Sequence, residues 1–138
     1  MIVADTSFIY ALLDRRDGRH GEARSWYEDE QPELATTPLV LAEADHLAAT
    51  RGGGTAAQAF RRDVRAGAYA VEWWPGAESD AAGLAERYAE LGLTDASLIA
   101  LLERLGDIRI ATFDERHFRA VRPASRHAAY TLLPADAG

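Results

Sequence analysis

Short apolar segments alternate with longer helical segments along this chain, and no two neighbouring apolar segments are joined by a hairpin turn signal. The apolar segments, which we expect to form strands, are 2–4, 34–37, 69–73, 108–112 and 130–133. Parallel strands need long crossover connections, and helices in those connections cover the sheet. The pattern therefore predicts an α/β fold with three layers, α/β/α, around a central and mostly parallel sheet.

Helical periodicity and end signals place the helices between these strands. The predicted helices are 6–13, 21–30, 38 to about 50, 55–65, 79–91 and 94–105. The glycines at 52–54 are predicted to form a turn between two helices, because no strand precedes them to make a phosphate-binding loop. The length of 138 residues suits one domain, so we predict a single domain over 1–134 and a loose tail at 135–138.

Composition removes several classes of chemistry. The chain has no cysteine, which excludes disulfides, thiolate metal sites and cysteine nucleophiles. All 15 basic residues are arginine, so mechanisms that need a lysine are excluded as well. No apolar stretch is long enough to span a bilayer, and the N-terminus does not resemble a signal peptide. We expect a soluble, cytoplasmic protein with no membrane partner. The net charge of −7 disfavours a generic basic nucleic-acid binder.

Four acidic residues either follow a predicted strand, where ligands bind, or lie on an apolar helical face, where an ionised carboxylate lowers stability. Asp5 and Asp114 follow predicted strands, and ligands of open α/β sheets bind beyond the carboxyl ends of the strands. Glu43 shares an apolar helical stripe with Val40, and Asp95 lies in the first turn of a helix whose stripe faces the core. Both of these acids are therefore expected on faces that exclude water.

Clustered carboxylates in such surroundings need positive charge nearby. Oxygen ligands without cysteine favour Mg²⁺ or Mn²⁺ over zinc. Other roles remain open for single residues: Asp95 could stabilise a helix N-terminus through the dipole, while Asp5 and Asp114 could be ordinary turn residues. Glu43 has no such turn or cap role, so the four together indicate a metal site.

Four segments also resemble one known family, the PIN domain, and within it the VapC toxins of bacterial toxin–antitoxin pairs. They are Val3-Ala4-Asp5-Thr6-Ser7, Leu41-Ala42-Glu43, the segment 93–100 (Leu-Thr-Asp-Ala-Ser-Leu-Ile-Ala) and the segment 111–118 (Ala-Thr-Phe-Asp-Glu-Arg-His-Phe). The resemblance covers nearly the whole chain. It implies Mg²⁺- or Mn²⁺-dependent cleavage of RNA, a homodimer, and inhibition by a cognate antitoxin protein.

Carried over residue by residue, the resemblance makes Asp5, Glu43, Asp95 and Asp114 the metal-binding acids, with Thr6 or Ser7 and Thr112 as supporting hydroxyl residues. Ser97 is a further candidate for orienting a carboxylate. One or two cations would activate water for attack on phosphorus and stabilise the charge that develops there. The family resemblance implies products with 5′-phosphate and 3′-hydroxyl ends.

Several arginines after Asp114 are candidates for gripping RNA phosphates: Arg116, Arg119, Arg122 and Arg126. A solvated face is the alternative for these four. For His117 a capping or surface role is favoured over contact with substrate. Two other functions stay open: a catalytically silent module that binds RNA or a protein partner, and a nuclease that cuts DNA.

Overall fold

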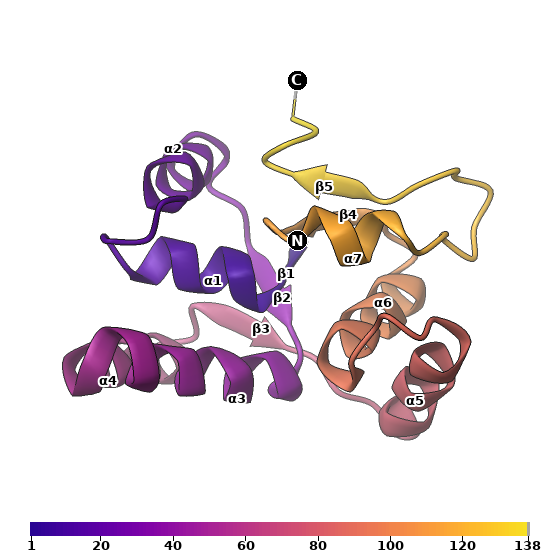
Figure 1. Cartoon of the computed structure of the whole chain (residues 1–138), viewed down its shortest axis with the longest axis horizontal. Helices are drawn as coiled ribbons and strands as arrows, with labels where there is room; N and C mark the ends of the chain where they lie inside the picture. Colours follow the sequence, from indigo (N-terminus) through magenta and orange to yellow (C-terminus); the bar gives the residue numbers. More distant parts are fainter. Residues whose placement is uncertain (138) are drawn as a thin grey trace.

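The computed structural model describes residues 1–137, and its strands and helices alternate as the sequence predicts (Figure 1). The strands are β1 (Ile2–Ala4), β2 (Leu34–Thr36), β3 (Tyr69–Val71), β4 (Arg109–Ala111) and β5 (Thr131–Leu133). The helices are α1 (Thr6–Leu13), α2 (His20–Glu30), α3 (Pro38–Leu47), α4 (Gly53–Arg65), α5 (Ala77–Arg87), α6 (Leu93–Leu105) and α7 (Glu115–Arg119), with a π-helical turn, η1 (Ala48–Gly52), between α3 and α4.

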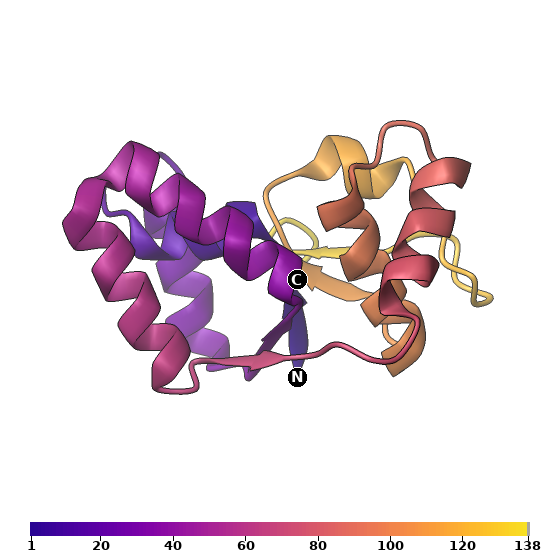
Figure 2. The ribbon, with the colours of Figure 1, turned by 90° about the horizontal axis from the view of Figure 1, so that it is seen from below.

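The five strands form one sheet in the order β3-β2-β1-β4-β5, and all four pairings are parallel. From β1 the chain moves outward to β2 and β3, then crosses back to β4 on the other side of β1. Figures 1 and 2 accordingly show α1 to α4 on one side of the sheet and α5 with α6 on the other. The prediction of a three-layer α/β/α fold is confirmed. The connections change from one face of the sheet to the other between β1 and β4. Sheets of this kind bind their ligands at that point.

The core explains why α6 can hold a site residue firmly. Between Ala96 and Leu102 every residue of α6 is buried, and α6 packs on α5, α3 and β1. A helix that is apolar on all sides belongs in the interior. The first turn of α6 is therefore fixed relative to β1, and that turn carries Asp95.

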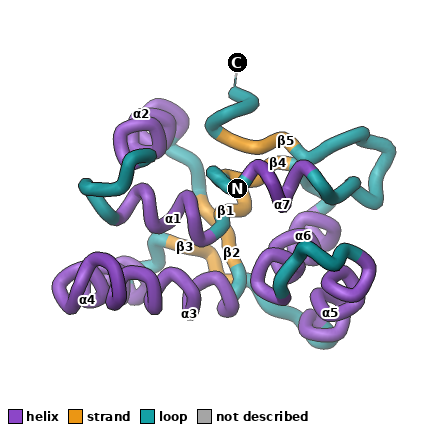
Figure 3. Tube along the Cα trace, viewed as in Figure 1, coloured by secondary structure: helices purple, strands orange, loops and turns teal. Residues whose placement is uncertain are grey.

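Helix α3 departs from the prediction at its C-terminal end. The predicted helix to about residue 50 stops at Leu47, and the chain continues as the π-helical turn η1 before Gly53 adopts a left-handed φ of 81°. At Gly52 an added Cβ would lie 2.6 Å from the Cβ of Ala56, so a larger residue there would clash with the first turn of α4. The junction between the two helices, both purple in Figure 3, falls in the glycine run as predicted, but Gly53 and Gly54 already belong to α4, which starts two residues earlier than expected.

The short helix α7 was not predicted, and the strand predicted at 69–73 is shorter than expected, ending at Val71. Five residues are too few for a periodic signal, and α7 starts because the Asp114 carboxylate accepts a hydrogen bond from the amide of His117 at 3.2 Å. That short helix is what turns His117 back toward α6.

The predicted loose tail includes Gly138, which lies outside the described residues. Before it, the Asp136 carboxylate accepts hydrogen bonds from the Arg119 guanidinium at 2.6 and 3.0 Å and from the Leu132 amide at 2.8 Å. Within residues 1–137 there is no helix with the length and apolar character needed to cross a membrane.

Candidate active site

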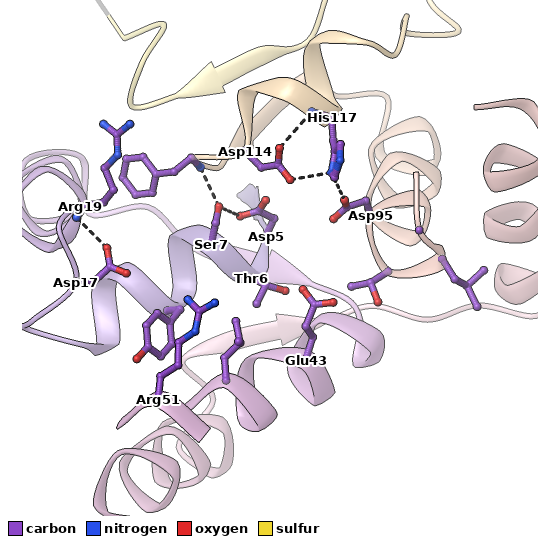
Figure 4. Close-up of a pocket in the computed structure, with 16 residues that line it drawn as sticks. Asp5, Thr6, Ser7, Asp17, Arg19, Glu43, Arg51, Asp95, Asp114 and His117 are labelled. Carbon is purple, nitrogen blue, oxygen red and sulfur yellow. Dashed lines mark hydrogen bonds and ion pairs between the residues drawn. The ribbon is translucent and has the colours of Figure 1, made fainter. Parts of the chain in front are cut away.

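The four predicted acids line one cavity of about 490 Å³ at the carboxyl edge of the sheet (Figure 4). Asp5 follows β1 and caps α1, Asp114 caps α7, and Asp95 lies in the first turn of α6. Glu43 comes from α3, whose own N-terminus is capped by Thr37 with Pro38 in the first turn. Four helices that start at this edge therefore bring together carboxylates that are up to 109 residues apart in the sequence.

Asp5 is the most firmly held of the four. Its Oδ1 accepts hydrogen bonds from Ser7 Oγ at 2.7 Å and from the Phe8 amide at 3.1 Å, and its Oδ2 accepts one from Thr112 Oγ1 at 2.6 Å. The Thr112 hydroxyl in turn accepts from the Asp114 amide at 2.9 Å. The side chain of Asp5 is only 3% exposed, so these donors fix one orientation of its carboxylate.

Asp95 and Asp114 meet at the imidazole of His117. Its Nδ1 lies 3.1 Å from Asp95 Oδ2 and 2.9 Å from Asp114 Oδ2. These three side chains offer metal-ligand atoms that all lie within 4.8 Å of one another. The carboxylates of Asp95 and Asp114 therefore both lie against a single ring nitrogen.

The electrostatics of the cavity disfavour ionised carboxylates when no cation is bound. Burial raises the pKa of Asp5 to about 6; the Thr112, Ser7 and Phe8 donors oppose the rise, and Asp95 adds to it. Burial also raises the pKa of Asp95, with Asp114 and Glu43 adding to the rise and His117 opposing it. A divalent cation would remove this penalty by favouring the charged form of each acid.

The structure places Glu43 differently from the expectation. Its neighbours Val40 and Ala44 are buried, but Glu43 itself is exposed on the open wall of the cavity (Figure 4). The expected water-excluding face is therefore wrong for Glu43, because the stripe of α3 that packs on the core runs beside this position. An exposed glutamate keeps the freedom to reach a ligand in the cavity.

The supporting hydroxyl residues divide into two groups. Ser7 and Thr112 bond Asp5 directly, as described, and Thr6 lines the cavity. Ser97 is hydrogen-bonded to none of the four acids: its Oγ donates to the Thr94 carbonyl at 2.6 Å and lies 2.8 Å from Thr37 Oγ1. Ser97 therefore ties the start of α6 to the start of α3, so it acts on the site through the helices that carry it.

The arginines predicted to grip RNA lie outside the cavity lining. Arg116, Arg122 and Arg126 are exposed on α7 and the loop that follows it, and Arg119 makes a two-pronged ion pair with Asp136. The cavity lining contains Arg19 and Arg51 instead.

Sequence-based reasoning missed the place of three residues: His117, Arg19 and Arg51. The position of His117, three residues after Asp114, would have pointed to it if the helix α7 had been foreseen, because residues three apart on a helix are neighbours. For Arg19 and Arg51 the chain offers no local signal, since tertiary packing alone brings α2 and η1 to the cavity.

The side chains present fit a hard divalent cation. Four carboxylates supply oxygen ligands of the kind that Mg²⁺ and Mn²⁺ take. Thr6 Oγ1 is buried and has no hydrogen-bond partner among the described residues, which leaves one further oxygen in the cavity lining with an unmet interaction.

Comparison with known proteins agrees with this geometry. Ribonuclease VapC26 of Mycobacterium tuberculosis is 32% identical over 136 residues, a match that covers 96% of this chain and 100% of the relative. The crystal structure of Mycobacterium tuberculosis VapC20, described as a Sarcin-Ricin loop cleaving toxin, superposes with a TM-score of 0.77 at 29% identity and covers 85% of this chain and 92% of that chain. The family model of the PIN domain matches residues 2–123. The chain therefore belongs to the PIN-domain family.

Proposed function

We propose that this chain is a divalent-metal-dependent endoribonuclease that hydrolyses RNA phosphodiester bonds, and that it is the toxin of a toxin–antitoxin pair. The observation that carries the proposal is the meeting of Asp5, Glu43, Asp95 and Asp114 around one cavity at the switch point of the sheet. Membership of the PIN-domain family and the similarity to a ribonuclease and to an RNA-cleaving toxin support the same reaction.

The protein's own part is to supply carboxylate oxygens where a divalent cation would bind. Asp5 is held by three hydrogen bonds, so its side chain loses little conformational entropy when its oxygens bind a cation. Asp95 and Asp114 face it from α6 and α7, and Glu43 completes the ring from α3. A bound divalent cation supplies activation of the attacking water and neutralises charge on the phosphate.

Mg²⁺ or Mn²⁺ is the cation that we propose, because the four acids are oxygen donors and the chain has no thiolate. His117 is a candidate nitrogen ligand beside them, since its Nδ1 already lies within 3.1 Å of Asp95 and closer to Asp114. Asp5 and Asp95 are proposed as the strongest ligands.

The remaining parts of the proposal concern partners and location. The proposed toxin acts in the cytoplasm as a homodimer, with RNA as its substrate and a cognate antitoxin protein as its inhibitor. Its support is the similarity to VapC26 and VapC20, the second of which is described as a toxin.

The experiment that tests the proposal is cleavage of total cellular RNA by the purified protein with Mg²⁺ or Mn²⁺. Discrete fragments that disappear with EDTA and with Asp5→Asn are expected. No cleavage by folded, antitoxin-free protein would favour the silent binding module, and metal binding measured by calorimetry would then separate an intact site from a vestigial one. Cleavage of DNA under the same conditions would widen the substrate class.

A further inference from the structure

The cavity that holds the acids also has a basic end (Figure 4). Asp95, Asp114 and His117 gather at one end, and Arg19 and Arg51 lie at the other, with Asp5 and Glu43 between them. A polyanion that entered the cavity would therefore meet cationic side chains on one side of the carboxylates.

Arg51 is built into this place by the backbone. It belongs to the π-helical turn η1, and π-turns inside helices frequently mark functional sites. Its guanidinium carbon lies 5.8 Å from the centroid of the Tyr10 ring. Tyr10 is a rigid platform, because it is only 4% exposed and its hydroxyl donates to Asp14. Among the described residues no carboxylate lies within ion-pair distance of Arg51, so its guanidinium can donate hydrogen bonds to a ligand.

Arg19 has a similar support on the opposite wall. Its guanidinium carbon lies 5.4 Å from the centroid of Phe113, and that ring stacks on Phe8 at 6.0 Å. Phe113 stands between Thr112 and Asp114 in the sequence, so Arg19 rests on the segment that carries site residues. Within residues 1–137 Arg19 makes one ion pair, with Glu22 at 3.3 Å, which is exposed and therefore weak enough to be exchanged for a phosphate.

The lining of the cavity is mostly acidic, so a phosphate of the substrate needs cationic side chains to bind it. Five carboxylates line it, those of the four proposed metal ligands and Asp17, and the Asp17 carboxylate accepts a hydrogen bond from the Arg19 amide at 2.8 Å. Cations bound by the four acids would serve the reacting phosphate, whereas the next phosphate along an RNA strand would still face an acidic lining. Planar guanidinium groups bind phosphate through paired hydrogen bonds.

We propose that Arg19 and Arg51 bind a phosphate that flanks the scissile bond and so fix the direction in which the RNA strand crosses the carboxylates. Both are positioning residues, since they contact substrate away from the reacting phosphorus. The inference rests on the proposed ribonuclease function and adds to it a subsite on one side of the bond that is cut.

Steady-state kinetics on an RNA oligonucleotide that contains a mapped cleavage site test the subsite. Arg51→Ala and Arg19→Ala are each expected to raise KM about tenfold, the size of one charge-assisted hydrogen-bond contact, with kcat changed less than about twofold. Arg62→Ala is the matched control, because Arg62 is an exposed arginine of α4 outside the cavity lining. Its KM should stay at the wild-type value, and thermal melts should show all three variants folded.

A second measurement removes the charge from the substrate. Single methylphosphonate linkages, which carry no charge, are introduced one at a time on either side of the scissile bond. The wild type should lose affinity at one flanking linkage on one side only, and Arg51→Ala should be indifferent to the same replacement. If the arginine variants behave like Arg62→Ala and no flanking linkage matters, the subsite is refuted while the nuclease stands. A wild type that cuts no RNA would refute the proposed function and the subsite with it.

Discussion

Replacing Asp5 by asparagine should stabilise the protein in the absence of metal while it abolishes activity. Burial raises the pKa of this carboxyl from 3.8 to about 6. At about 1.36 kcal/mol per pKa unit, keeping it ionised in the folded chain costs roughly 3 kcal/mol at neutral pH. Asparagine has nearly the same shape and no charge, so the variant escapes that cost.

The sign of the pH dependence follows from the direction of the shift. Below pH 3.8 the acid is protonated in both the folded and the unfolded chain, and its full contribution to stability is present. As pH rises toward about 6 the unfolded chain ionises first, so stability is lost across that window and stays low above it. The advantage of Asp5→Asn should therefore grow between about pH 4 and pH 6 and then level off.

In the wild type Thr112 Oγ1 donates to Asp5 Oδ2, whereas in the variant the asparagine amide must donate to Thr112 Oγ1. This rearrangement reduces the gain in stability by about 1 kcal/mol. A net gain of about 2 kcal/mol remains. For a chain of 138 residues the unfolding entropy is about 0.3 kcal/mol/K, so the melting temperature should rise by about 5–10 °C at pH 7.5.

Thermal unfolding in EDTA, followed by circular dichroism at several pH values, measures this difference. Asp45→Asn is the control, since burial is minor there and the Arg61 guanidinium holds the pKa of Asp45 below its usual range, so no stabilisation is expected. Mg²⁺ or Mn²⁺ should raise the melting temperature of the wild type much more than that of Asp5→Asn. A variant that melts at or below the wild-type temperature at every pH would refute the electrostatic reasoning.

Three further results are expected. Thr112→Val should weaken metal activation by about 10- to 100-fold in a titration of initial rate against metal concentration, because Asp5 loses its buried hydroxyl donor. Ser97→Ala should lower the free energy of unfolding in urea by about 1 kcal/mol with kcat retained, because Ser97 is hydrogen-bonded to Thr37 and to none of the acids. Equal effects of both variants on metal activation would contradict this division. His117→Ala should shift the ratio of activity in Mn²⁺ to activity in Mg²⁺ toward Mg²⁺, since a nitrogen ligand favours the softer ion, and an unchanged ratio would remove His117 from the ligand set. End-group analysis of the cleaved RNA should find 5′-phosphates and 3′-hydroxyls; a 2′,3′-cyclic phosphate would show that the ribose hydroxyl is the nucleophile.

Much of the fold could be predicted because its signals are local. Strand–helix alternation gave the parallel sheet, and Thr37 followed by Pro38 marked the start of α3 at the residue where the structure begins it. The same reasoning put Asp5 after β1 and Asp114 after β4. These strands are neighbours in the sheet, and that is why their carboxylates lie in one cavity.

The rest depended on tertiary contacts that no local pattern records. The exposure of Glu43 depends on which stripe of α3 packs against the core, and Ser97 bonds a hydroxyl 60 residues away in the sequence. His117 required a five-residue helix that is too short for periodicity to reveal. The cavity positions of Arg19 and Arg51 follow from a π-turn and from the path of the chain before α2, neither of which has a reliable sequence signature.

The spread of the four acids along the chain has a consequence for biosynthesis. A nascent polypeptide that has been translated only as far as α5 contains Asp5 and Glu43 but neither Asp95 nor Asp114. The outer neighbour of β4 is β5, at residues Thr131–Leu133, so the sheet that supports the last acid is complete only after these residues have been synthesised. Products that end before α6 therefore lack two of the four proposed metal ligands, and we expect them to cleave no RNA.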